Sequence, residues 1–109
     1  MDDAMITTAL TLPGYKIVNN YGVVRGLIVR SRSIIGNFLG TIQTIFGGNI
    51  TIYTDLCEQA RSDTYILMRD HAERLGANAI ITVRYDATEL MSGLTEVLCY
   101  GTAVYVEPE

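Results

Sequence analysis

The fold is decided by one stretch, residues 55–86, which reads DLCEQARSDTYILMRDHAERLGANAIITVRYD. It opens on a capping box, with Asp55 as N-cap and Glu58 three residues later, and it carries a helix stop where Gly76 follows Leu75. The residues between these signals fall on two faces, one with Leu56, Ala60, Thr64, Leu67, Met68, His71 and Leu75, the other with Glu58, Arg61, Tyr65, Arg69 and Glu73. This spacing predicts an amphipathic helix of about five turns whose first face lies on a β-sheet.

Two strands are expected after this helix. Residues 79–88 and 95–106 are rich in β-branched and aromatic side chains, which favour strands. The residues between them, 91–94, include a glycine that suits a turn. The two runs are therefore predicted to form an antiparallel hairpin.

Three further segments precede the helix. Residues 15–30 are rich in Val, Ile and Tyr with glycines at 22 and 26, which predicts one long strand or two strands bent at a bulge. Residues 5–8 predict a short strand of the kind that adds to a neighbour's sheet edge. Residues 33–54 carry no charge, and the apolar side chains between 35 and 46 recur at helical spacing, which predicts a small helix. Its neutral face suggests close packing against a neighbouring subunit or a ligand.

The order of these elements is strand, small helix, long helix, strand, strand. It indicates an α+β fold in which an antiparallel sheet is covered by one long helix plus a short amphipathic helix. With 109 residues and no linker-like stretch, the chain is expected to form a single domain over 1–109.

The composition points to assembly. Residues of the set AVILMFWYC make up 49% of the chain and charged residues 18%, against roughly 25% in a typical soluble domain. No stretch approaches the roughly 18 consecutive apolar residues of a membrane span. A small domain buries only about 60–70% of its unfolded surface. We therefore expect apolar surface in excess of the core, and a homo-oligomer.

The charges exclude some partners. Twelve acidic residues against eight basic ones give a net charge of −4, without the basic footprint that nucleic acid requires. Two cysteines are too few for a disulfide-stapled secreted domain, so both are expected to be reduced thiols. The first residues, MDDAM, lack the pattern of a signal peptide. We expect a cytoplasmic protein that binds neither nucleic acid nor membranes.

Several short segments, in this order, match a known family. They are GYKIV at 14–18, YGVV at 21–24, IFGG at 45–48, YTD at 53–55, AR at 60–61, LGANAI at 75–80 and YGTAV at 100–104. Over nearly the whole chain they resemble the YbjQ-like family of small bacterial and archaeal proteins. The resemblance implies a dodecin-like β-α-β-β subunit that assembles into a ring, expected to be a homopentamer. The family is commonly labelled heavy-metal-binding, and its function is otherwise uncharacterised.

The chain departs from the family in the predicted small helix. That segment often carries an Arg-Asp pair and a later arginine, where this chain has Gly36, Asn37 and Gln43. A charge-dependent role of the segment is therefore in doubt, and the change makes the expected ring interface more apolar.

The candidate metal ligands are Cys57, His71 and Cys99. Cys57 and His71 lie 14 residues apart on one predicted helix, or about 21 Å, so one chain cannot chelate an ion with both. Cys57 with Cys99 stays open if the helix packs on the hairpin, and ring symmetry could gather copies of one residue. The alternative for each cysteine is a buried small hydrophobe, and for His71 a hydrogen-bonded core or interface histidine.

Two functions follow from these residues. The first is a ring-forming homo-oligomeric binding module for a heavy metal or another soft ligand held through Cys57 or Cys99. The second is a small enzyme or organic-cofactor-binding domain with its site at the subunit interface, around His71 and the strand tyrosines Tyr15, Tyr21, Tyr85, Tyr100 and Tyr105. Enzymatic activity is the weaker interpretation, because the sequence has no strained nucleophile turn, GxGxxG or P-loop.

Overall fold

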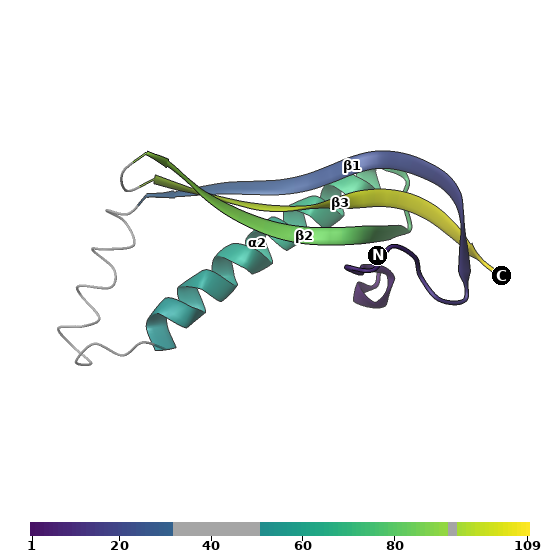
Figure 1. The fold of residues 1–109 in the computed structure, drawn as a ribbon, viewed down its shortest axis with the longest axis horizontal. Coiled ribbons are helices and arrows are strands. Elements are labelled where there is room, and N and C mark those ends of the chain that lie inside the picture. Colours follow the sequence, from purple (N-terminus) through teal and green to yellow (C-terminus); the bar gives the residue numbers. More distant parts are fainter. Residues whose placement is uncertain (32–50, 92–93) are drawn as a thin grey trace.

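The computed structural model describes residues 1–31, 51–91 and 94–109. Its elements are η1 (Asp3–Met5), β1 (Tyr15–Ser31), α2 (Thr51–Leu75), β2 (Ala79–Met91) and β3 (Leu94–Pro108). Within these residues the strands form one antiparallel sheet in the order β1-β3-β2, and α2 runs across one face of it (Figure 1). The predicted α+β fold with its antiparallel sheet and long helix is confirmed. The predicted small helix falls mainly on 32–50, outside the described residues.

The predicted hairpin is formed by β2 and β3. Their pairing runs from Met91 opposite Leu94 to Ala79 opposite Val104. β3 is the central strand, because it also pairs antiparallel with β1 along its length. Between Leu94 and Val104 this strand therefore has a neighbouring strand on both sides, which is why the core is centred on it.

The first predicted segment forms one long strand, β1, the first of the two alternatives, and this strand carries irregularities near Gly22. The pairing of β1 with β3 shifts between Ile17 and Asn19 and again between Asn20 and Gly22. Gly22 has a φ of +87°, a conformation that glycine adopts without a steric penalty, and its N–H donates to Asn20 Oδ1 over 2.7 Å.

A glycine in β1 brings the helix down onto the sheet. At Gly26 an added Cβ would overlap the backbone carbonyl of Thr64 and lie 2.7 Å from the backbone nitrogen of Met68. The helix can pass this close only because the strand has no side chain there. The core between the layers consists of Val24, Met68, Ala72, Ala77, Ile80, Val83, Cys99 and Ala103.

The long helix differs from the prediction at its start and in its buried face. It begins at Thr51, so Asp55 lies inside the helix and is not its N-cap. The core stripe consists of Ala60, Thr64, Met68 and Ala72, while Leu67 and Leu75 are each 43% exposed. The reason is the close approach at Gly26: the side chains spaced by four that line the contact are small apart from Met68, and Leu67 and Leu75 point past its edge.

The N-terminal segment lies against the hairpin of its own chain. Ile6 forms a single parallel bridge with Ile80, and the backbone of Thr7 bonds to both Ile80 and Val83. The prediction of a short strand at 5–8 is therefore wrong in the described residues, while addition of this segment to a neighbour's sheet edge stays a prediction. The segment instead covers the edge of β2, next to a bulge where Thr82 has a φ of +55°.

Candidate functional site

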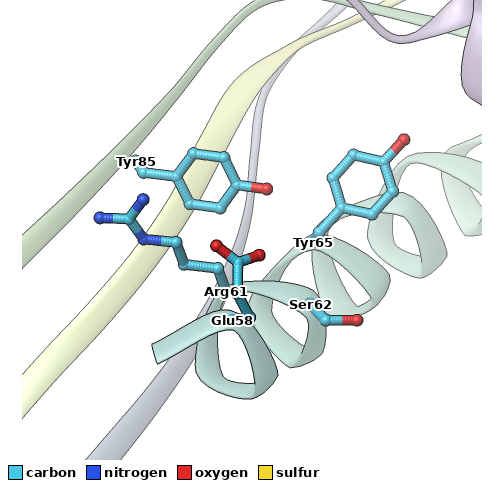
Figure 2. Close-up of a pocket in the computed structure, with 5 residues that line it drawn as sticks. All are labelled: Glu58, Arg61, Ser62, Tyr65 and Tyr85. Atoms are coloured by element: carbon cyan, nitrogen blue, oxygen red, sulfur yellow. The ribbon is translucent and has the colours of Figure 1, made fainter. Parts of the chain in front are cut away.

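A groove between α2 and β2 is the candidate site. Its volume is about 390 Å³, and it is lined by Glu58, Arg61, Ser62 and Tyr65 of α2 and by Tyr85 of β2 (Figure 2). The helix residues share one face because they are spaced by three and four. Tyr85 faces the helix because it pairs with Cys99, on the core side of β3. We call this cleft the α2–β2 groove.

Each aromatic ring of the groove is held by an arginine. The guanidinium of Arg61 lies 5.8 Å from the centre of the Tyr85 ring, and that of Arg69 lies 5.9 Å from the Tyr65 ring. Both distances fit cation–π contacts. The Tyr65 hydroxyl also donates to Asp3 over 2.8 Å. Neither Arg61 nor Glu58 forms an ion pair within the part of the chain that the structure describes.

Both phenols are neutral at physiological pH. Burial raises the pKa of Tyr65 to about 12, and its hydrogen bond to Asp3 adds to the rise. Burial likewise raises the pKa of Tyr85 to about 12, where the neighbouring Cys99 thiol and Glu58 add to the effect and Arg61 opposes it. The groove therefore offers two hydroxyls, a carboxylate and a guanidinium.

Two buried sulfur atoms lie below Tyr85. Cys99 and Met68 are both 0% exposed, and Cys99 Sγ lies 3.6 Å from Met68 Sδ. Burial raises the pKa of the Cys99 thiol, although its hydrogen bond with Tyr85 acts in the opposite direction. Met68 was not among the predicted ligands. Its place on the inner helix face was the available signal, since that face was expected to meet the hairpin that carries Cys99.

The two cysteines of one chain occupy different environments. Cys57 is exposed on α2, whereas Cys99 is buried. Cys99 contacts Met68, which lies 11 residues beyond Cys57, or about 16 Å along the helix axis. The described residues contain no group of three or more His, Cys, Asp and Glu side chains that could hold a metal ion. A metal held by Cys57, Cys99 or His71 stays a prediction.

His71 lies away from the groove, toward β1. Its Nδ1 accepts a hydrogen bond of 3.3 Å from the backbone N–H of Arg25. The partly buried ring is thus a hydrogen-bonded histidine at the layer interface, the second of the two interpretations considered for it. The structure does not bring it together with the groove tyrosines in one chain.

The comparisons with known proteins identify the family. Residues 4–107 match the YbjQ family model, described as "Putative heavy-metal-binding". The chain belongs to the YbjQ family. It is 67% identical over 104 residues to a UPF0145 protein of Chromobacterium violaceum, covering 95% of this chain and 89% of that one. It is 62% identical over 103 residues to a UPF0145 protein of Burkholderia mallei strain SAVP1, covering 94% and 93%.

A solved structure is also similar to this YbjQ-family chain. It is the crystal structure of a protein of unknown function of the DUF74 family from Pediococcus pentosaceus, with 17% sequence identity and a TM-score of 0.49. The alignment covers 97% of this chain and 100% of that one. In the described residues of this chain, no helix is both long and apolar enough to cross a membrane. The cytoplasmic location stays a prediction.

Proposed function

We propose that this YbjQ-family protein is a ring-forming, dodecin-like homo-oligomeric module, a homopentamer, that binds a soft metal ion. The observation that carries the assembly is a largely apolar sheet face that no element of the described residues covers in full. Val24 and Gly26 of β1 face α2 and are buried, so the residues between and beside them point the other way. On that side Val23, Leu27 and Val29 are 69%, 46% and 49% exposed, and the exposed Arg25 lies among them.

Only one end of this outer face of the sheet is covered by other described residues of the chain. At one end Leu12, packed with Met5, covers a second apolar cluster made of Ala79, Ile81, Val104 and Val106. At the other end Val23, Leu27 and Val29 continue the apolar face next to Tyr100, which is 36% exposed. We call these four residues the outer sheet patch. The apolar side chains that surround Arg25 on this face can be buried by a second layer, and a copy of the same chain supplies one. Burial contributes about 25 cal/mol per Å² of apolar surface.

The proposed number of five subunits rests on the resemblance to the family. The proposed metal binding rests on the description of the family model. Cys57 offers an exposed thiol and Cys99 a buried one, and thiolates are ligands for soft metals. A single chain supplies too few ligands for a four-coordinate site, so an exposed Cys57 needs copies from other subunits.

Native mass spectrometry of protein purified without chelator tests both parts. Five chains of 12.0 kDa give a mass of about 60 kDa, with additional mass for retained metal. Val23→Lys should release monomers, because it places a charge in the patch at a position that a monomer leaves exposed. Asn19→Lys, which adds the same charge at another exposed position of β1, is the control. A wild-type mass of about 12 kDa would overturn the assembly.

The α2–β2 groove favours a second candidate, an organic ligand. Two tyrosine rings with a carboxylate and a guanidinium, neither of which forms an ion pair among the described residues, suit a small planar molecule that carries polar groups. Retained organic mass that is lost in Tyr85→Ala but kept in His71→Ala would support this function at the groove. If the organic mass were lost only in His71→Ala, the ligand site would lie near β1 rather than in the groove.

A further inference from the structure

The buried sulfur pair of Cys99 and Met68 has the chemistry of a metal site. A thiol on the central strand and a thioether on the helix, both 0% exposed, lie 3.6 Å apart. Two sulfurs bound to one metal ion at about 2.3 Å lie about 3.8 Å apart at a tetrahedral angle and about 4.6 Å apart in the linear arrangement of a two-coordinate ion. The sulfurs must therefore separate by up to about 1 Å to hold an ion, and the flexible methionine can supply this movement.

We propose that Cys99 and Met68 bind a monovalent soft cation, Cu(I), which reaches them from the α2–β2 groove past Tyr85. The proposal rests on the proposed metal-binding function and gives it residues and a metal class. Thiolate and thioether sulfur select Cu(I), whereas structural Zn(II) takes four ligands from Cys, His and carboxylates.

The charge balance favours a monovalent ion. On binding, the Sγ–H bond of Cys99 breaks, its proton goes to water and an Sγ–Cu bond forms, with no change in the oxidation state of the metal. A thiolate and Cu(I) are neutral together. A divalent ion on the same thiolate would leave a net positive charge among the buried apolar side chains Val24, Ile80 and Val83.

Tyr85 controls access to the pair. It lies opposite Cys99 across the strands, and it is 45% exposed on the groove side. In Figure 2 the Tyr85 ring forms the wall of the groove above the carboxylate of Glu58, with Arg61 beside it. Glu58 attracts a cation to the groove, while Arg61 opposes it and holds the ring in place. Rotation of the ring would open the thiol and leave its hydroxyl as a further oxygen ligand.

The test titrates Ag(I), the redox-inert analogue of Cu(I), into the purified oligomer carrying Cys57→Ser, with calorimetry and native mass spectrometry as readouts. We expect one Ag(I) per chain, no binding after Cys99→Ala, and affinity at least about tenfold lower after Met68→Leu, which keeps the side-chain volume. Met91→Leu, at a methionine 65% exposed on β2, is the matched control and should leave affinity unchanged. Circular dichroism confirms that each variant is folded.

The possible failures are distinct. If wild type binds Ag(I) and the Cys57→Ser protein does not, the sulfur pair is refuted and the proposed metal binding survives through Cys57. If neither binds, both are refuted. An Ag(I) affinity unchanged by Met68→Leu would show that the thioether is not a ligand.

Access past Tyr85 is tested separately. Tyr85→Ala should accelerate Ag(I) uptake several-fold, and Tyr105→Ala, at an exposed tyrosine on β3, should not. Equal rates overturn the route.

Discussion

At the scale of single residues, Tyr65 and Tyr85 make stability depend on alkaline pH. The folded chain raises the pKa of each from its ordinary value of 10 to about 12. Below pH 10 both states hold the phenol protons. Between pH 10 and 12 the unfolded chain releases them while the folded chain retains them, so the free energy of unfolding falls as pH rises through this window. The buried Cys99 thiol, whose pKa is also raised, acts in the same direction.

Tyr65→Phe and Tyr85→Phe should each make this fall shallower, because phenylalanine has no proton to release. Urea unfolding at pH 9 and at pH 11.5 measures the difference for each variant and for the double variant. At pH 9 Tyr65→Phe should cost stability, since it removes the hydrogen bond to Asp3, worth about 0.5–1.5 kcal/mol. A pH slope equal to that of wild type in the double variant would contradict the raised pKa values.

At the scale of elements, the contact between α2 and β1 depends on Gly26. Gly26→Ala would force the added methyl against the Thr64 carbonyl and the Met68 backbone, so the helix must move away. We expect a loss of about 1–3 kcal/mol in the free energy of unfolding, the usual cost of overpacking, measured by urea denaturation. Gly22, with φ +87° and open space around it, is the control. Asn adopts a positive φ more readily than other side chains, so Gly22→Asn should cost less than Gly26→Asn, which costs at least as much as Gly26→Ala.

The same contact explains which parts of the elements could be predicted. The end of α2 could be predicted because it depends only on neighbouring residues. Gly76 has a φ of +92°, and the N–H of Ala77 donates a hydrogen bond to the carbonyl of Ala72. The width of the buried face depends on Gly26, a residue of another element. For that reason Leu67 was wrongly placed in the core and Ala72 was missed. The hairpin was predictable because the two strands and the turn between them are contiguous.

The candidate site was less predictable than the fold. Cys99 was singled out from its chemistry, but its neighbour Met68 depends on the register between a helix and a strand, which no spacing in the sequence encodes. The α2–β2 groove likewise depends on how the helix is placed against a strand. Arg61 and Tyr65 were expected on the solvent side of the helix, and the approach of β2 turned that side into one wall of a cleft.

At the scale of the whole molecule, the outer sheet patch predicts how stability responds to dilution. If a second copy covers the patch, folding and association are coupled, and the melting temperature of wild type rises with protein concentration. Replacing Val23, Leu27 and Val29 together by Thr keeps strand propensity but removes most of the apolar surface that association buries.

The triple variant should therefore melt at a temperature independent of concentration, and below wild type by an amount that grows as the protein is concentrated. Scanning calorimetry over a hundredfold concentration range measures how the melting temperatures of wild type and the triple variant change with concentration. Light scattering gives the mass in each sample. In a chain that stays monomeric, polar replacements at side chains 46–69% exposed would leave the melting temperature nearly unchanged at every concentration. That result would show that the patch faces solvent rather than another subunit.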